Sequence, residues 1–353
     1  MKIGLLTDLH ITASPDRAFG IKKSLELISK AFEEEKVDIV INLGDTFNKA
    51  YIESIQEMQV FNYYIKLFKK FKNYILIGNH EILESGNLDN SIWDVIKNLD
   101  HKNFNLIDNF TTFGCGGLIS NDYSIGLLPY GCEIPSDKKV RVLFHHLDVM
   151  GMFYPSGKMI EPGRYTLNLA DNLAEFYVGG HIHIEQEKEN SKYLGSTFPQ
   201  PFDYIENFNI KKLASFNIYD TETREYKKFY NPYPRVNLKY SETDDYQKII
   251  YDLKSIWGVN ADYKVYIRFL YTSSEYDASL MDKTIKKAFD KKDLTIEFFR
   301  KVKSGSPLCS TSEESREIVE QDPEQPNKGL EEKVLNLLRE KDPELIKIYE
   351  KVK

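Results

Sequence analysis

Five short polar motifs, each directly after an apolar run, constrain the fold of this chain more than any other feature. They contain six of its seven histidines. In chain order they are Asp8-Leu9-His10, Gly44-Asp45, Gly78-Asn79-His80-Glu81, His145-His146 and Gly180-His181-Ile182-His183. Short apolar runs predict buried strands, and open α/β sheets bind ligands at the carboxyl ends of their strands. We therefore expect the five motifs to converge on one site.

Strand and helix patterns alternate along residues 1–235. The predicted strands are Lys2–Leu6, Val37–Leu43, Tyr74–Ile77, Val140–Phe144 and Phe176–Val178. Apolar residues recur at helical spacing in Arg17–Glu35 and Ser54–Phe71. Strands that are apolar on both faces, interleaved with amphipathic helices, indicate an α/β sheet covered on each side.

The pattern changes after residue 196. Leu213–Tyr219 and Glu225–Tyr230 predict a hairpin, and Pro232 and Pro234 mark a boundary. Residues 240–302 then show a helix, strand, helix, strand order, with strands at Asp262–Tyr271 and Leu294–Val302. We expect a domain at residues 1–235 and a small α/β domain at 236–302.

The last 51 residues differ in composition from the rest. Residues 303–328 are rich in Ser, Pro, Glu and Gln and have few large apolar residues, which predicts a flexible linker. Residues 329–353 carry two apolar stripes at helical spacing. These two helices either fold back on this chain or dock on a partner.

Composition limits the classes of function. The net charge is −7, whereas a protein that grips DNA alone usually has a basic surplus. The substrate is therefore small, the basic residues are clustered on part of the surface, or a partner protein contributes to DNA binding. Cys115, Cys132 and Cys309 form no disulfide or zinc pattern. No apolar stretch approaches a membrane span, so we expect a cytoplasmic protein without membrane contact.

The motif residues offer carboxylate, amide and imidazole donors, which suit Mn²⁺, Fe or Zn better than Mg²⁺. Asp8 and His10, like His181 and His183, are two residues apart and project to the same side of an extended chain. A single such residue is more often structural, but the combination predicts a pair of metals bridged by Asp45. Two cations about 3.5–4 Å apart can activate water and neutralise the charge that develops in phosphoester hydrolysis. His101 lies in a polar stretch and is expected at the surface.

The motif order resembles that of the calcineurin-like metallophosphoesterases. The Asp-Leu-His opening, the His-Leu-Asp-Val-Met-Gly segment and Tyr193-Leu194-Gly195-Ser196 are similar to the SbcD-type nuclease subunit of the double-strand-break repair complex, especially its phage recombination-endonuclease branch. The resemblance implies a sandwich of two β-sheets flanked by helices, a small α/β capping domain and C-terminal helices.

The resemblance also implies roles for single residues. One metal would be held by Asp8, His10, Asp45 and His183, and the second by Asp45, Asn79, His146 and His181. His80 would be catalytic, orienting or protonating the leaving oxygen. Glu81 stands where the superfamily usually has Asp, which is expected to alter the support of His80. The fourth motif leaves His145 or His146 as the ligand, and the family register favours His146.

The function implied is a Mn²⁺-dependent DNA exonuclease and endonuclease with two Mn²⁺ ions. The family works as a homodimer with an SMC-like coiled-coil ATPase that binds DNA, on which the C-terminal helices dock. Such a partner would explain the acidic charge. Two alternatives share the fold: a stand-alone phosphodiesterase or phosphatase for small molecules, and a non-catalytic scaffold. The filled ligand positions and His80 argue against the scaffold.

Overall fold

The computed structural model describes residues 1–83, 91–97, 102–114, 124–135, 138–200, 204–205, 208–231, 235–272, 283–287, 289 and 294–300. Met1–Val302 form one compact unit. The predicted linker and terminal helices at 303–353 lie outside the described residues, as do His101, Cys115 and Cys309.

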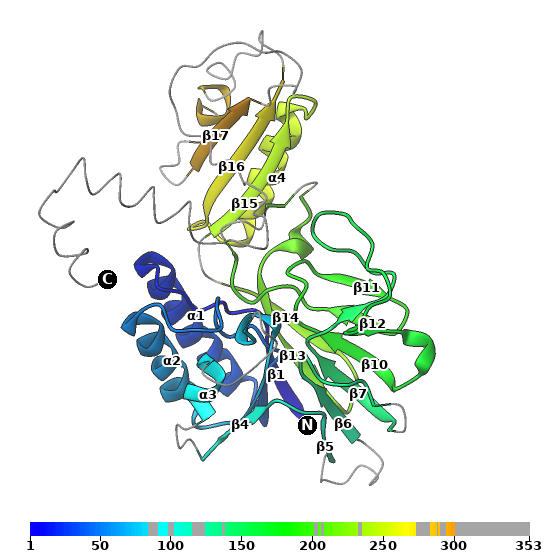
Figure 1. Cartoon of the computed structure of the whole chain (residues 1–353). Helices are drawn as coiled ribbons and strands as arrows, with labels where there is room; N and C mark the ends of the chain where they lie inside the picture. Colours follow the sequence, from blue (N-terminus) through cyan, green and yellow to red (C-terminus); the bar gives the residue numbers. More distant parts are fainter. Residues whose placement is uncertain are drawn as a thin grey trace, which may run out of the picture. The chain divides into compact units, whose positions relative to one another are not determined.

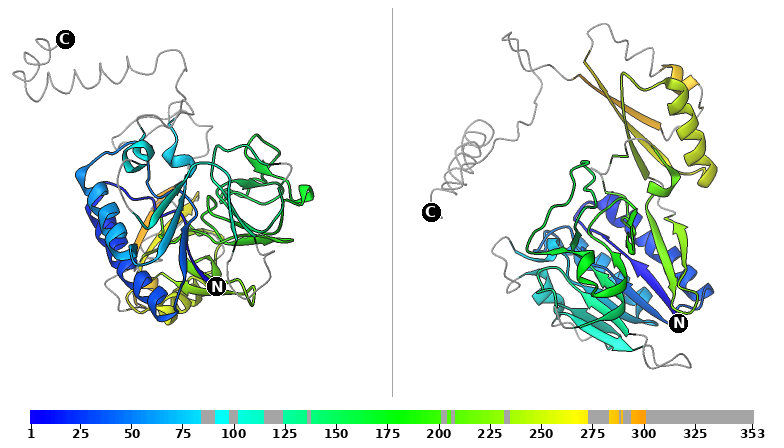
Figure 2. Two further views of the ribbon diagram at one scale, coloured as in Figure 1. Left: turned by 90° about the horizontal axis from the view of Figure 1, so that it is seen from below. Right: turned by 90° about the vertical axis from the view of Figure 1, so that its right-hand side faces the viewer.

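Two six-stranded sheets pack face to face in the body of the protein (Figures 1 and 2). The first sheet has the order β14 (Tyr226–Tyr230), β13 (Ser215–Asp220), β1 (Lys2–Leu6), β2 (Ile39–Asn42), β3 (Lys72–Leu76) and β4 (Phe104–Ile107). The second has the order β11 (Gln186–Lys188), β12 (Ser191–Tyr193), β10 (Ala174–Gly179), β7 (Val140–His145), β6 (Ser124–Leu128) and β5 (Thr111–Gly114). Neighbours among β1 to β4 are parallel, as are β6, β7 and β10. The two-sheet α/β class is confirmed.

The core between the sheets consists of side chains that alternate inward from both. Leu5, Ile41 and Leu76 of the first sheet belong to one buried cluster with Phe144 and Val178 of the second. Burying apolar surface of this kind supplies the main favourable free energy of folding. The carboxyl ends of the two sets of parallel strands are thereby brought together.

Helices cover the outer face of the first sheet: α1 (Pro15–Glu34), α2 (Ile55–Phe68) and α3 (Ile92–Lys97) (Figure 1). Glu57 accepts a hydrogen bond from the Ser54 N–H (3.0 Å) and so caps the start of α2. We expected helices on the outer face of the second sheet, but loop segments cover it instead. The loop segments around β8 (Asp148–Val149) and β9 (Thr166–Leu167) pack on it with apolar side chains.

The small α/β region has a three-stranded parallel sheet, β15 (Arg235–Ser241), β16 (Lys264–Tyr271) and β17 (Leu294–Arg300), with α4 (Tyr246–Val259) on one face. The first predicted helix and both predicted strands are present, and most of the segment of the second predicted helix lies outside the described residues. Strand β15 was not predicted, because the nearby Pro232 and Pro234 concealed the alternation of its buried residues. The domain boundary near residue 235 stays a prediction. In the described part of the chain, no helix combines the length and apolarity that a bilayer crossing requires.

Candidate metal centre

The five motifs come together at one end of the sandwich. Three of them follow the adjacent parallel strands β1, β2 and β3, and two follow the adjacent strands β7 and β10. The expected convergence at the carboxyl ends of strands is present in the structure. Segments up to 175 residues apart thus reach a common point.

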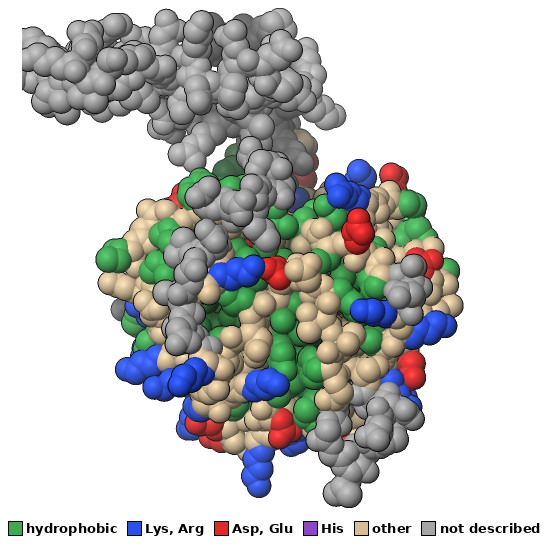
Figure 3. All heavy atoms as spheres, turned by 60° about the horizontal axis from the view of Figure 1, so that its bottom comes forward, with side chains coloured by type: hydrophobic (Ala, Val, Ile, Leu, Met, Phe, Trp, Pro, Cys, Tyr) green, Lys and Arg blue, Asp and Glu red, His purple; other side chains and the backbone are tan. Residues whose placement is uncertain are grey.

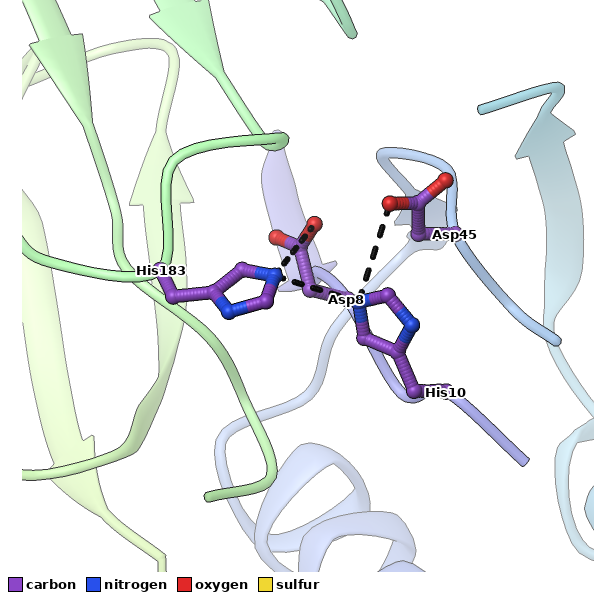
Figure 4. A group of neighbouring side chains, drawn as sticks. All are labelled: Asp8, His10, Asp45 and His183. Atoms are coloured by element: carbon purple, nitrogen blue, oxygen red, sulfur yellow. Dashed lines mark hydrogen bonds and ion pairs between the residues drawn. The ribbon is translucent and has the colours of Figure 1, made fainter. Parts of the chain in front are cut away.

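The first group of ligands consists of Asp8, His10, Asp45 and His183, whose donor atoms lie within 4.8 Å of one another. Figure 4 shows these side chains gathered around a shared space, with Asp8 and His10 on the loop after β1 and Asp45 and His183 on two other loops. His10 Nε2 lies 3.1 Å from His183 Nε2 and 3.6 Å from Asp45 Oδ2. Such short spacings between donors suit a cation between them.

The second group contains Asp45, His146 and His181, with the Asn79 side chain beside them. His146 Nε2 lies 3.3 Å from Asp45 Oδ1, while Asn79 Oδ1 lies 2.8 Å from His181 Nδ1. Asp45 therefore presents Oδ2 to the first group and Oδ1 to the second. It is the shared carboxylate that the sequence pattern predicted.

One buried atom of the first group is left for a metal. Among the residues that the structure describes, Asp8 Oδ2 is buried without a hydrogen-bond partner. An unsatisfied buried carboxylate oxygen is costly unless it binds a cation. The donor set of carboxylate, amide and imidazole matches divalent transition metals.

The electrostatics of the cluster are dominated by burial and by Asp45. Burial raises the pKa of Asp8 and lowers the pKa of His10 well below its usual value. Burial opposes ionisation of Asp45, but the neighbouring histidines, His146 foremost, hold its pKa well below the usual range. Burial would lower the pKa of His146, yet the charge of Asp45 raises it to about 9. Without metal, His146 is thus protonated near neutral pH, and a cation binding there displaces the proton.

The geometry of the site agrees with the family to which the sequence is similar. The sequence model of the calcineurin-like phosphoesterase family matches residues 1–185, the region that contains every ligand described above. This chain belongs to the calcineurin-like phosphoesterases. It is a metallophosphoesterase with a dimetal site of histidines and aspartates.

One similar solved structure is a dimetal phosphatase from Danio rerio, with 11% identity and a TM-score of 0.36, covering 62% of this chain and 91% of that one. No curated protein sequence matches the chain.

The loops of the metallophosphoesterase site hold several ligands in an unusual backbone conformation. Asp8, His10, Asp45 and His181 have φ angles of 49°, 44°, 49° and 77°. Non-glycine residues rarely adopt this left-handed region, and such strain concentrates at functional sites. Gly78 allows the close approach, since a Cβ there would overlap the Asp45 carboxylate.

His80 lies at the rim of the cluster, with about a third of its side chain exposed. Its Nδ1 lies 2.7 Å from the Asn48 carbonyl oxygen, so Nδ1–H donates to that oxygen. Nε2 then faces Asp45, 3.9 Å from Oδ2. A ring fixed in this way can deliver a proton from Nε2 to a leaving oxygen, which agrees with the role that the resemblance implied.

The remaining two predicted site residues lie in different environments. Glu81 is buried and accepts hydrogen bonds from the Phe47 and Gly78 N–H groups (2.8 and 2.7 Å), so it joins the second and third motif loops. His145 is the last residue of β7 and packs beside Tyr193 instead of facing the cluster. The structure therefore places His146, and not His145, among the ligands.

Sequence reasoning missed one residue of this metallophosphoesterase site. Asp148 Oδ1 lies 3.3 Å from His181 Nε2, on the side of the ring opposite the metal-facing Nδ1. Carboxylates in this position fix the tautomer of a metal-binding histidine and increase its basicity. The available signal was its place two residues after His146 in the His-Leu-Asp segment.

Proposed function

We propose that this metallophosphoesterase is a Mn²⁺-dependent DNA exonuclease and endonuclease. The observation that supports it is a cavity of about 540 Å³ that joins the metal centre to basic residues of the small sheet. The lining includes Asp45, Asn79, His80, His181 and His183 of the motif loops, and Arg235, Lys239 and Arg268 of the small sheet together with Lys212. A phosphodiester polymer presents several phosphates in a row, so it suits both groups at once.

We call Arg235, Lys239 and Arg268 the basic wall, because these three residues lie on the same face of the small sheet. Val236 and Leu238 of β15 are buried against α4, so the alternate residues Arg235 and Lys239 occupy the opposite face. Arg268 pairs with Lys239 on the neighbouring strand β16, so it occupies the same face. This face supplies the cavity with positive charge even though the chain as a whole is acidic.

The guanidinium groups on this face are held by aromatic rings. Arg268 lies 4.2 Å from the centroid of Tyr204 and 4.8 Å from that of Phe299, and Arg235 lies 4.3 Å from that of Tyr266. Stacking of this kind orients a guanidinium while its edge remains able to bind phosphate. By contrast, the face in Figure 3 intersperses basic and acidic side chains.

Hydrogen bonds connect the basic wall to the metal loops. The Asn237 amide of β15 donates to the Gln200 carbonyl oxygen (2.8 Å), and the Gln200 amide donates to the Asp8 carbonyl oxygen (3.3 Å). These two hydrogen bonds hold β15 of the small sheet at a fixed position relative to the loop of the first motif. A bound strand can therefore meet the basic residues and the metals together.

The chemistry follows from these positions. When bound, two divalent cations would polarise the scissile phosphate and neutralise the charge that develops on it. Asp8, His10, Asp45 and His183 would hold one of them, and Asp45, Asn79, His146 and His181 the other. His80 would protonate the leaving oxygen, and the basic wall would hold the flanking phosphates.

We also propose the partners that the resemblance implied: a second copy of this chain and an SMC-like ATPase, with residues 329–353 docking on the ATPase. The partner would supply the DNA affinity that an acidic chain lacks. This part of the proposal rests on the sequence of the tail and its charge.

The test is substrate selectivity in an Arg268→Gln variant. Hydrolysis of linear DNA with Mn²⁺ should fall about 10- to 100-fold, as for the loss of a charge-assisted hydrogen bond. Hydrolysis of a small diester, bis-p-nitrophenyl phosphate, should change less than about twofold by the same reasoning. Arg141→Gln, on β7 and paired with Glu175, is the matched control.

Two outcomes would overturn the nuclease assignment. One is an equal loss of both activities in Arg268→Gln. The other is intact DNA alongside hydrolysis of mononucleotide esters when the wild-type protein is assayed with its ATPase, which would favour the small-molecule phosphodiesterase.

A further inference from the structure

We infer that Tyr154 is a positioning residue for the second metal, acting through Asp148 on His181. The Tyr154 hydroxyl donates a hydrogen bond to Asp148 Oδ2 (2.6 Å), and Asp148 Oδ1 lies 3.3 Å from His181 Nε2. The other ring nitrogen of His181 lies 2.8 Å from Asn79 Oδ1, in the second ligand group. The three side chains thus form a relay of one hydrogen bond and one ion-pair contact that ends at a metal ligand.

Each member of the relay has a defined function. Asp148 keeps the His181 proton on Nε2, which leaves the Nδ1 lone pair for a cation. Tyr154 occupies the second carboxylate oxygen and so fixes the rotamer of Asp148. Burial, followed by the hydrogen bond to Asp148, raises the pKa of Tyr154 to about 12, so the hydroxyl remains a donor at neutral pH.

The backbone around Tyr154 is anchored on both sides, so the hydroxyl has a fixed position. The Tyr154 N–H donates to the Lys158 carbonyl oxygen (2.9 Å) and the Gly157 N–H donates back to the Tyr154 carbonyl oxygen (2.9 Å). This turn is held to β11 by Gln186, whose side chain bonds both the N–H and the carbonyl oxygen of Phe153 (3.0 and 2.6 Å). The relay therefore rests on a supported turn.

Tyr154 also lines the cavity that contains the metal centre. Its hydroxyl could alternatively bind substrate directly, so the two roles have to be separated by experiment. A direct contact affects the affinity for substrate, whereas the relay affects the affinity for metal in the absence of any substrate.

The experiment is a calorimetric titration of metal-free protein with Mn²⁺, comparing wild type, Tyr154→Phe, Asp148→Asn and the double variant. Asp148→Asn should weaken one of the two bound ions about 10- to 100-fold. Tyr154→Phe should weaken the same ion to a smaller extent, by roughly three- to tenfold on the same scale. The double variant should bind no more weakly than Asp148→Asn, because Tyr154 acts only through that carboxylate.

Tyr165→Phe is the matched control, since its ring packs on Tyr130 in the same aromatic group (5.0 Å between centroids). It should bind both ions as the wild type does. The inference is overturned if Tyr154→Phe binds both ions normally and raises only KM, or if the losses in the double variant add. Thermal denaturation of each metal-free variant shows whether the fold is intact, and a retained Tm with weakened Mn²⁺ binding supports the relay.

Discussion

His80 differs from the ligand residues because its ring is tied to a backbone carbonyl at Nδ1 and directs Nε2 toward the cluster from the rim. The ligands, by contrast, are mostly buried and converge on Asp45. This separates two tasks among chemically similar side chains: holding the metals, and moving a proton.

Replacing His80 by Asn should therefore reduce kcat and leave the metal site intact. The expected loss is about 10²- to 10⁴-fold, the usual contribution of a positioned acid or base. The measurements are kcat on a small diester and bound metal by elemental analysis. A variant with normal kcat, or one that loses its metal together with its activity, contradicts the separation of tasks.

Most ligands could be predicted from the sequence because each is a polar residue directly after a strand. Asp148 and Tyr154 were not predicted, since neither lies in one of the five motifs, although Asp148 stands two residues after His146. Their role depends on where the segment after β7 meets the His181 ring, and that is a property of the fold. The motif register favoured His146 over His145, and the direction of each side chain agrees with that choice.

At the level of elements, α1, α2 and β1 to β3 were predictable because their apolar patterns are strong. The short helix α3 and strands β4 and β6 were not predicted. Strands β5, β11 and β12 were not predicted either, because they are short and several of their residues are half-exposed or exposed. Which strands pair with one another also cannot be predicted from the order of apolar residues along the chain. The loop segments that cover the outer face of the second sheet are held by scattered apolar residues, and these follow neither a helical nor a strand period.

Close packing of β1 on α1 makes Gly4 sensitive to substitution. A Cβ at this position would lie 2.5 Å from Phe32 Cε2, so Gly4→Ala should destabilise the protein by about 1–3 kcal/mol. Gly114→Ala on β5 is the control, because no heavy atom lies within 4 Å of the added Cβ. Chemical denaturation measures both variants, and equal stability of the two would refute this packing argument.

Glu185 joins the two sheets, since it pairs with Lys192 of β12 (2.9 Å) in the second sheet and with Lys228 of β14 in the first. Burial opposes its ionisation, but the bonds to Lys228 and Lys192 hold its pKa below the usual 4.5. The stabilising contribution is therefore complete above pH 4.5 and is lost as the pH falls through the lower value in the folded protein.

In the metal-free protein, the Tm of the Glu185→Gln variant should therefore fall less than the Tm of the wild type when the pH is lowered below 4.5. The two proteins should differ most above that pH, where the wild type is more stable. Scanning calorimetry across the acid range tests this. Parallel pH profiles for the two proteins would show that the ion pairs do not contribute.

At the level of the whole molecule, residues 1–302 form a compact unit that contains the metal centre and the basic wall. Truncation after Lys303 should therefore leave Mn²⁺-dependent diester hydrolysis within about twofold of the full chain, because no described contact of the site is removed. It should abolish co-purification with the SMC-like ATPase that we propose as a partner. Undiminished co-purification would remove the proposed docking role from the tail.

The central claim is that two cations share the Asp45 carboxylate. Anomalous diffraction from a crystal grown with Mn²⁺ tests it most directly. We predict two peaks about 3.5–4 Å apart, one beside Asp45 Oδ2 with His10 and His183, and one beside Oδ1 with His146 and His181. A single peak, or peaks that leave Asp45 uncoordinated, would contradict the account.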